Sequence, residues 1–462
     1  MKKIIYFILA IYFYSCSSSV QLPRESKFLN FSDVHFDPFY DTTLVGKLIQ
    51  SEYTQWESIY ESSEIKSLSS YGSDSNFPLF KSAMEEMRSR ISDPDFIIIT
   101  GDFMGHNFNE EYEEYSGIKN TDSLDLFIKK TIQFCTAFIV KHFPNTVIFP
   151  MVGNDDSYCG NYMVEPNGDF LKMLGEVWEP LVNKGVKNKS FEDDFSKGGY
   201  CLLDFPGTDD YKLIILNTIF FSSNYQNLCG DSLDDPGADE LVWLERTLKK
   251  CRDDNDKVWI SYHIPPGIDI YGTINGKGDC EQKIFPTWKK KYNDEFLKIM
   301  TDHDDIIKSG FAGHFHRDDF RIFYENGSPV SYIHLTPSIS PIYQNNPAYQ
   351  VLEYDKSKFE LINYKTYYLN DITGSADWTF EYDFQNTYRQ SSISANTLNT
   401  ISKLIFSDST YRKSYIELYT SRDRKAFPKD YINWKYNWCG FRNLTVEDFA
   451  ECICKDTLDS DK

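Results

Sequence analysis

Short apolar runs that end in metal-binding types of side chain recur along this sequence and constrain its fold more than any other feature. The runs cover residues 27–31, 96–100, 147–152, 213–216, 258–262 and 306–312. Helical stripes of apolar residues lie between them, at 79–91, at 124–139 and after Pro236. This alternation predicts βαβ units, whose strands present their carboxyl ends at one edge of an α/β sheet.

Seven potential metal ligands follow these runs: Asp33, His35, Asp102, Asn154, His263, His314 and His316. The pairs Asp33/His35 and His314/His316 are spaced by two, so in extended backbone each pair points to one face. Asp102 follows a glycine, and its carboxylate could bridge two cations through its two oxygens. Counting Asp102 twice gives two four-ligand sites of nitrogen and oxygen, a set that suits two divalent ions, zinc before magnesium.

Any one of these residues has an ordinary structural interpretation. A single histidine more often satisfies a hydrogen bond in the core than binds a metal, and we assign His142, His303 and His334 to that role. The set as a whole is different, because five of the eight histidines lie at or just beyond strand ends, beside the glycine turns and in one consistent order. We therefore predict a binuclear metal site.

The charge of the chain argues against a nucleic-acid polymer as its partner. The 462 residues include 48 basic and 69 acidic ones, a net charge of −21, and no basic patch is visible. With 41% apolar and 16% aromatic residues the chain is expected to bury a large core. No oligomeric state follows from the sequence.

The N-terminus, residues 1–19, is predicted to be a signal peptide. Lys2 and Lys3 precede an apolar run at 4–14, which is too short for the roughly 20 residues that span a bilayer. In an alternative interpretation this is a lipoprotein signal, and Cys16 becomes the acylated first residue. Either signal predicts a secreted, cell-surface or periplasmic protein. A lipoprotein signal further predicts a lipid anchor at Cys16 and contact with a membrane surface.

The rest of the chain is expected to form a catalytic domain at 20–372 and a small helical subdomain at 373–462. Apolar residues at 398, 401, 404 and 405 give one helical face, and Cys439, Cys452 and Cys454 follow it. Because disulfides persist outside the cytosol, we expect one of them to clamp this subdomain, although the spacing leaves the connectivity open.

The motifs, in order, resemble those of the calcineurin-like metallophosphoesterases, and more narrowly of the acid sphingomyelinase-like phosphodiesterases. They are Asp33-Val34-His35, Gly101-Asp102, Gly153-Asn154, His263 and Gly313-His314-Phe315-His316. The resemblance implies a metallophosphoesterase β-sandwich flanked by helices, with a small helical, cysteine-containing C-terminal subdomain. It also implies two ligand sets: Asp33, His35, Asp102 and His316 for one ion, and Asp102, Asn154, His263 and His314 for the other.

By the same resemblance, the chain would be an exported phosphodiesterase in which a metal-bridged hydroxide attacks phosphorus. Its substrate would be a phosphodiester lipid such as sphingomyelin, cleaved to ceramide and phosphocholine, or a nucleotide. Two alternatives remain. One is an endopolyphosphatase or nucleotide pyrophosphatase, and the other is a non-catalytic surface binding protein on the same scaffold.

One position departs from the family pattern. Sphingomyelinase-like enzymes usually have a histidine after the motif asparagine, and here that residue is Asp155. His106, four residues after Asp102, matches a second histidine of the family and is our preferred general acid. Asp155 would serve only if burial or nearby charge raised its pKa, and neighbouring cations would oppose that.

Overall fold

The fold is described from a computed structural model, which covers residues 26–227, 229, 235–373, 377–423, 425 and 427–455. The predicted signal segment, residues 1–19, lies outside the described residues. No helix among these residues is both long enough and apolar enough to span a membrane.

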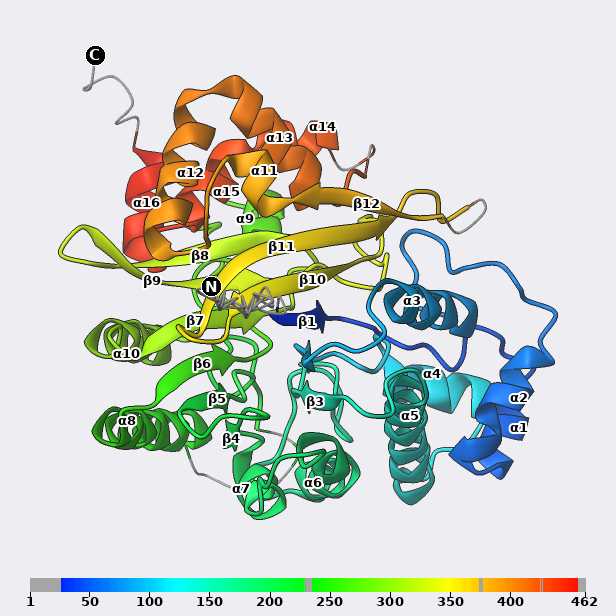
Figure 1. The fold of residues 1–462 in the computed structure, drawn as a ribbon. Helices are drawn as coiled ribbons and strands as arrows, with labels where there is room; N and C mark the ends of the chain where they lie inside the picture. The colour runs from blue at the N-terminus through cyan, green and yellow to red at the C-terminus, as the bar shows by residue number, and fades with distance from the viewer. Residues whose placement is uncertain are drawn as a thin grey trace, which may run out of the picture.

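Twelve strands form two six-stranded sheets (Figure 1). The first sheet contains β1 (Ser26–Phe31), β2 (Phe96–Ile99), β3 (Val147–Pro150), β10 (Ala348–Asp355), β11 (Glu360–Leu369) and β12 (Trp378–Asp383). The second contains β4 (Cys201–Asp204), β5 (Tyr211–Ile215), β6 (Lys257–Ser261), β7 (Ile307–Ala312), β8 (Asp319–Glu325) and β9 (Ser328–Leu335). Their orders are β12-β11-β10-β1-β2-β3 and β4-β5-β6-β7-β9-β8.

The helices of the first half are α1 (Val45–Gln50), the 3-10 turn η1 (Tyr53–Gln55), α2 (Trp56–Glu61), α3 (Phe77–Arg90), α4 (Phe108–Ser116), α5 (Thr121–His142), α6 (Asp169–Val182) and α7 (Phe191–Gly198). Those of the second half are α8 (Pro236–Asp254), α9 (Ile270–Asn275), α10 (Lys290–Asp302), α11 (Phe384–Tyr388), α12 (Ala395–Ser407), α13 (Ser409–Tyr419), α14 (Phe427–Ile432), α15 (Trp434–Gly440) and α16 (Val446–Cys454).

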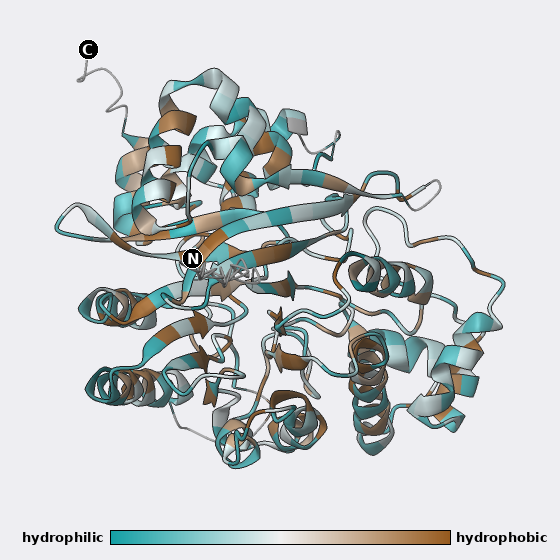
Figure 2. Ribbon diagram, in the orientation of Figure 1, coloured by the Kyte–Doolittle hydropathy of each residue, from teal (hydrophilic) through white to brown (hydrophobic). Residues whose placement is uncertain are grey.

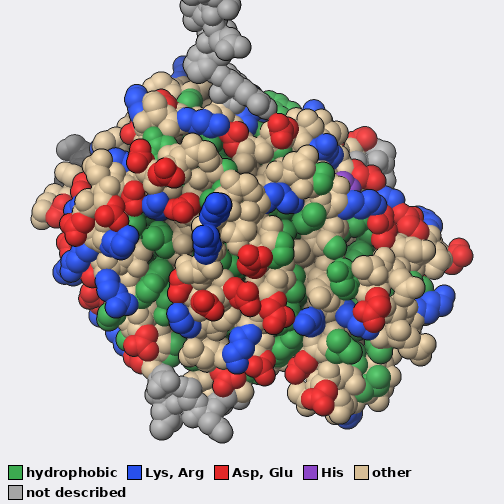
Figure 3. Space-filling view, turned by 60° about the horizontal axis from the view of Figure 1, so that its bottom comes forward, with side chains coloured by type: hydrophobic (Ala, Val, Ile, Leu, Met, Phe, Trp, Pro, Cys, Tyr) green, Lys and Arg blue, Asp and Glu red, His purple; other side chains and the backbone are tan. Residues whose placement is uncertain are grey.

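The helices surround the two sheets. In Figure 1, α8 and α10 lie beside the second sheet, α3 and α5 lie on the opposite side of the molecule, and α11 to α16 form a layer above β8 and β11. Apolar residues concentrate in the strands and on the inner helix faces (Figure 2), whereas acidic and basic side chains are interspersed over the face in Figure 3. The predicted α/β class, two sheets flanked by helices, is confirmed.

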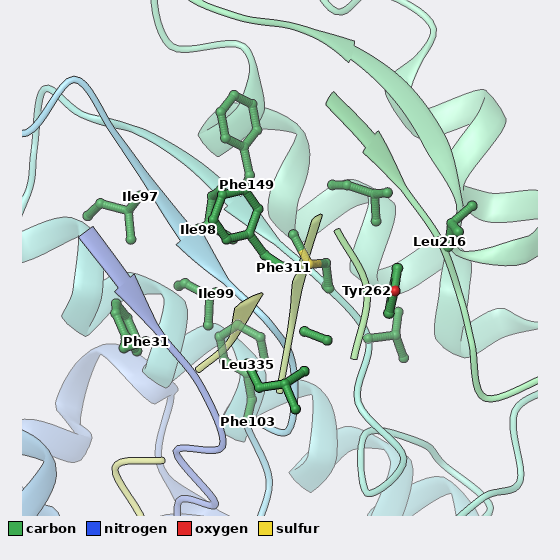
Figure 4. Close-up of a cluster of buried hydrophobic side chains, with 14 of the residues drawn as sticks. Phe31, Ile97, Ile98, Ile99, Phe103, Phe149, Leu216, Tyr262, Phe311 and Leu335 are labelled. Atoms are coloured by element: carbon green, nitrogen blue, oxygen red, sulfur yellow. The ribbon is translucent and has the colours of Figure 1, made fainter. Parts of the chain in front are cut away.

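Aromatic side chains fill the space between the sheets. The ring centroid of Phe28 in β1 lies 4.6 Å from that of Phe96 in β2, and 5.4 Å and 5.7 Å from those of Trp259 and Phe311 in the second sheet. Figure 4 shows further members of this core, Ile97 to Ile99 and Phe149 among them. Both faces of β2 and β3 are buried, which explains their uninterrupted apolar sequences.

The strands that carry the predicted motifs are parallel to their neighbours, as βαβ units require. β1 pairs in parallel with β2, β2 with β3, β5 with β6, and β6 with β7. The antiparallel strands β4, β8, β10, β11 and β12, together with β9, which pairs in parallel with β7, complete the sheets and were not predicted. The parallel pairs bring the carboxyl ends of the motif strands to a common edge.

The segment expected to be wholly helical, residues 373–462, begins with a strand instead. β12 pairs antiparallel with β11, so this part of the chain extends the first sheet before the helices start. Disulfides Cys439–Cys452 and Cys280–Cys454 then hold α16 to α15 and to the loop after α9. The expected disulfide-linked C-terminal cysteines are thus present, and a third bridge joins Cys159 to Cys229.

Candidate metal centre

All seven predicted ligands lie just beyond the carboxyl ends of parallel strands. Asp33 and His35 follow β1, Asp102 follows β2, Asn154 follows β3, His263 follows β6, and His314 and His316 follow β7. The side chains of six of them form two compact clusters, and the side chain of Asn154 joins the second cluster. Residues up to 283 positions apart in the chain therefore meet at one site, as the topology requires.

The first cluster contains Asp33, His35 and His316. The Nε2 atom of His316 lies 3.2 Å from Oδ1 of Asp33 and 3.2 Å from Nε2 of His35. The other nitrogen of His35, Nδ1, lies 3.0 Å from the carbonyl oxygen of Met104. A carbonyl partner requires a proton on Nδ1, so the neutral form of the ring would present the lone pair of Nε2 to the cluster.

The second cluster contains Asp102, Asn154, His263 and His314. Nε2 of His263 lies 3.0 Å from Oδ2 of Asp102 and 2.9 Å from Oδ1 of Asn154. Nδ1 of His263 lies 2.6 Å from the carbonyl oxygen of Thr100, which fixes this ring as Met104 fixes His35. Each cluster thus gathers imidazole nitrogen and amide or carboxylate oxygen around one point.

Asp102 connects the two clusters through one oxygen. Its Oδ2 lies 3.0 Å from Nε2 of His263 and 3.5 Å from Nε2 of His35. We expected both carboxylate oxygens to bridge, but Oδ1 accepts a hydrogen bond of 2.9 Å from the backbone N–H of Asp155. That bond turns the carboxylate so that only Oδ2 faces both clusters.

The backbone at the site is unusual, and here the expectation of extended backbone was wrong. β1 ends at Phe31, and the φ angles beyond the strands are 50° at Asp33, 42° at His35, 54° at Asp102, 72° at His314 and 57° at His316. These values lie in the left-handed region, which costs free energy for residues with a Cβ and clusters at functional sites. The paired ligands converge because the chain turns at each of them.

Glycines in the motifs allow close approach between the loops. A Cβ on Gly153 would overlap the carboxylate of Asp102, and one on Gly313 would overlap the hydroxyl of Ser32 and lie 2.8 Å from Oδ2 of Asp33. Any larger residue at either position would displace a candidate ligand. The glycine in the GN and GH motifs is therefore explained by space at the site.

Asp156 organises two of these loops and was not predicted from the sequence. Its Oδ1 accepts hydrogen bonds from the backbone N–H groups of Phe103 (2.9 Å) and Met104 (3.1 Å), and its Oδ2 accepts one from Gly153 (2.9 Å). The carboxylate thereby ties the loop of Asp102 to the loop of Asn154. Two adjacent aspartates after the motif asparagine were the signal that could have indicated a structural role.

The neighbouring carboxylates raise the pKa of His35 and raise that of His263 to about 9, so a bound cation would have to displace a proton from these two rings, whereas the other buried groups already fit a site for cations. Burial alone would raise the pKa of Asp102, but the neighbouring imidazoles of His263 and His35 hold it below its ordinary value. Burial lowers the pKa of His314 to about 3 and that of His316 to about 4, so both rings are neutral and able to donate a lone pair at neutral pH. Buried carboxylates need compensating positive charge, which divalent cations supply.

His106 and Asp155, the two candidate general acids, lie side by side at the edge of the first cluster. The ring of His106 stacks on that of His35 at 4.2 Å between centroids, and its Nε2 lies 3.7 Å from Oδ2 of Asp155. Burial and the negative charge of Asp102 raise the pKa of Asp155 to about 7. His106 is partly exposed and Asp155 is buried, so His106 is the more accessible to a substrate.

Asp74 holds His106 in place and was also missed. Its Oδ2 accepts a 2.7 Å hydrogen bond from the backbone N–H of His106, and its Oδ1 lies 3.0 Å from Nδ1 of the ring. Asp74 lies in a loop with no recognisable motif, 32 residues before His106, so no signal in the sequence could have found it.

The three histidines assigned to structural roles lie away from both clusters. His142 bonds the carbonyl of Phe138, His303 lies 3.1 Å from Oε2 of Glu245, and His334 lies 2.6 Å from Oε1 of Gln350.

Comparisons with known proteins identify relatives that are named as phosphodiesterases. No protein-family model matches the chain. A sphingomyelinase phosphodiesterase C of Dictyostelium discoideum is 30% identical, and the match covers 97% of each chain. An acid sphingomyelinase-like phosphodiesterase 3b of Homo sapiens is 27% identical over 92% of this chain and 90% of that protein. A cyclic GMP-AMP phosphodiesterase of Homo sapiens is 24% identical over 93% and 90%.

A solved dimetal phosphatase from Danio rerio is 11% identical to the chain, with a TM-score of 0.40 over 74% of this chain and 95% of that one. Two sheets flanked by helices, with Asp, Asn and His side chains at their common edge, define a metallophosphoesterase of the calcineurin-like class. Within that class, the chain belongs to the acid sphingomyelinase-like phosphodiesterase family.

Proposed function

We propose that the protein is an exported phosphodiesterase that uses two divalent metal ions. The observation that carries this proposal is the position of Asp102, whose Oδ2 faces Nε2 of His35 on one side and Nε2 of His263 on the other. A single carboxylate oxygen that faces two ligand clusters is one arrangement by which a carboxylate can serve a pair of adjacent cations. The membership of the family supports hydrolysis of a phosphoric ester as the reaction.

In this proposal Asp33, His35, Asp102 and His316 hold one ion, and Asp102, Asn154, His263 and His314 hold the other. The mixture of imidazole and carboxylate ligands favours zinc. When bound, such ions lower the pKa of a water molecule towards neutrality and stabilise negative charge on phosphate oxygens.

The remaining groups of the site have roles that do not depend on the metals. His106, oriented by Asp74 through Nδ1, is the candidate to deliver a proton from Nε2 to the leaving oxygen, since its side chain is partly exposed. Nearby Asp155 is the second candidate. The carboxylate of Asp156 holds the loop of Asp102 against the loop of Asn154.

Export is part of the proposal. The signal-like segment at residues 1–19 supports it, and so do the disulfides Cys159–Cys229, Cys280–Cys454 and Cys439–Cys452, because disulfides persist in oxidising compartments. In this proposal the exported protein is either free or attached to a lipid at Cys16. The proposal also divides the chain into a catalytic domain (20–372) and a C-terminal subdomain (373–462).

Hydrolysis of bis-p-nitrophenyl phosphate tests the central claim. The purified protein should release nitrophenolate, lose that activity in EDTA, and regain it when zinc is restored. A His142→Ala variant, which changes a histidine outside the site, should behave like the wild type. A protein that binds two metal ions and hydrolyses polyphosphate but no phosphodiester would instead be the endopolyphosphatase, and one that hydrolyses neither would be the non-catalytic binding protein.

A further inference from the structure

The loop that follows β3 carries the candidate ligand Asn154 and turns back on itself within the next eight residues. The backbone N–H of Tyr162 donates a 2.9 Å hydrogen bond to the carbonyl oxygen of Asn154, which closes the turn. Residues 158–163 are partly or largely exposed. Burial of apolar surface therefore holds this loop less firmly than it holds the strands of the core.

Asn161, in this loop, orients the amide of Asn154. The Nδ2 group of Asn154 donates hydrogen bonds of 3.0 Å to Oδ1 of Asn161 and 3.0 Å to Oδ2 of Asp155. Because both partners present oxygen atoms, the NH2 group of Asn154 faces them. The amide oxygen is left facing the second cluster, where it lies 2.9 Å from Nε2 of His263.

Tyr162, the next residue, contacts another member of the same cluster. Its hydroxyl oxygen lies 3.4 Å from Nε2 of His314. The backbone of Tyr162 is left-handed, with a φ angle of 58°. A residue with a bulky side chain adopts this conformation only where its surroundings enforce it. The loop therefore needs a constraint from outside to keep Asn161 and Tyr162 in place.

The disulfide between Cys159 and Cys229 supplies such a constraint. Cys159 lies two residues before Asn161, and Cys229 lies in the segment between β5 and α8. The bridge therefore joins the loop after β3, in the first sheet, to the loop after β5, in the second sheet. It crosses between the sheets at the edge where the candidate ligands meet.

The loop after β5 is itself anchored. The backbone N–H of Ser223 donates a 2.9 Å hydrogen bond to the carbonyl oxygen of Thr287, outside the loop. Beside the bridge, the N–H of Gln226 donates a 3.3 Å hydrogen bond to the carbonyl oxygen of Tyr162. The disulfide thus fastens the loop that carries Asn161 to a segment that other contacts already hold.

We propose that the Cys159–Cys229 disulfide is a positioning element of the second metal-binding cluster. By holding the loop, it keeps Asn161 against the amide of Asn154 and Tyr162 against the cluster, so that the ligands are oriented before a cation binds. This inference rests on the proposed function for the presence of a metal ion at this cluster. It gives the bridge a role at the site besides its contribution to stability.

Calorimetric titration of the metal-free protein with zinc tests the inference without turnover. The wild type should bind two ions. Replacing both Cys159 and Cys229 by serine should weaken one of the two binding steps about 10- to 100-fold, the usual effect of losing an outer partner of a metal ligand. Replacing both Cys439 and Cys452 by serine is the matched control, because that bridge joins α15 to α16, and both zinc affinities should stay unchanged.

Asn161→Ala gives a second variant that retains the disulfide. Asn161 is exposed, so its truncation should leave folding intact, and it should weaken the same zinc-binding step. Combining it with the serine substitutions at Cys159 and Cys229 should cost less than the sum of the separate losses, because both changes act through the same amide. Additive losses, unchanged zinc affinity in the serine variant, or equal weakening in the control would overturn the inference.

Hydrolysis of bis-p-nitrophenyl phosphate by the same proteins separates this inference from the proposed reaction. Selective weakening of one zinc-binding step in a protein whose wild type hydrolyses no phosphodiester would support the positioning role and reject the catalytic proposal. Unchanged zinc affinity in a serine variant of an active wild type would reject the positioning role alone.

Discussion

Replacing His106 by alanine should slow the hydrolysis of diesters with poor leaving groups much more than that of bis-p-nitrophenyl phosphate. An alkoxide needs a proton as it departs, whereas nitrophenolate is stable without one. Nε2 of His106 is the nitrogen free to supply this proton, because Nδ1 is held by Asp74 at 3.0 Å. The selective loss therefore follows from the position of the ring.

The size of the effect can be placed within the usual range for general acids. Such catalysis is worth about 10²- to 10⁴-fold, or roughly 3 to 5 kcal/mol in the barrier. Nε2 of His106 lies 3.4 Å from the hydroxyl of Tyr343 and 3.7 Å from Oδ2 of Asp155, two groups that could carry a proton in its absence. We therefore expect the lower end of the range, about 10²-fold.

The assay compares kcat/KM for a dinucleoside monophosphate, whose leaving group is an alkoxide, with kcat/KM for bis-p-nitrophenyl phosphate. The metal content of the His106→Ala variant should be unchanged, since His106 is not a proposed ligand. Asp155→Ala is the comparison variant. Equal loss on both substrates in His106→Ala would refute the assignment and indicate a role in binding phosphate, and a selective loss confined to Asp155→Ala would move the general acid to that residue.

Three further predictions concern metal binding and stability. Asp102→Asn should lower the metal content below two ions per chain and reduce turnover at least about 100-fold, because the shared oxygen loses its charge; elemental analysis showing two ions with normal turnover would contradict this. Replacing both Cys439 and Cys452 by serine should lower the free energy of unfolding in urea by about 3 kcal/mol, as expected for a loop with a sequence separation of 13. Burial raises the pKa of Glu240 well above its ordinary value, so the folded protein keeps a proton that the unfolded chain releases above about pH 4.5, and stability falls as the pH rises. Glu240→Gln should remove up to about 1.4 kcal/mol per pH unit of that decline above the ordinary pKa of a glutamate, and an unchanged slope would show that Glu240 ionises in the folded state.

The parallel half of the fold could be predicted because buried central strands have uninterrupted apolar sequences. β2 is Phe-Ile-Ile-Ile and is buried on both faces. β11 and β12 could not be found in the same way, since their aromatic and polar residues alternate irregularly. The segment 378–383 reads as part of a polar tail, and it becomes a strand only because the edge of β11 is available for pairing.

The candidate ligands could be predicted from residue type and position at strand ends, but their backbone geometry could not. Nothing in the identity of Asp33 or His316 predicts a positive φ, because these residues adopt it only when the surroundings enforce it. The role of Asp74 could not be predicted from the sequence for a related reason. Its contact with His106 depends on how a long loop folds back over the site, and no local pattern encodes that path.

Residues that were not predicted from the sequence stabilise the strained backbone at the candidate ligands. Five non-glycine residues in left-handed backbone cost on the order of 1 kcal/mol or more each, and they persist only where other contacts determine the loops. Asp156 supplies three such contacts through hydrogen bonds to backbone N–H groups, and Gly153 supplies the space that Asp102 needs. The cost of holding the ligands is therefore offset by residues that never face the site. Their effect is to orient Oδ2 of Asp102 towards both clusters before any cation or substrate binds.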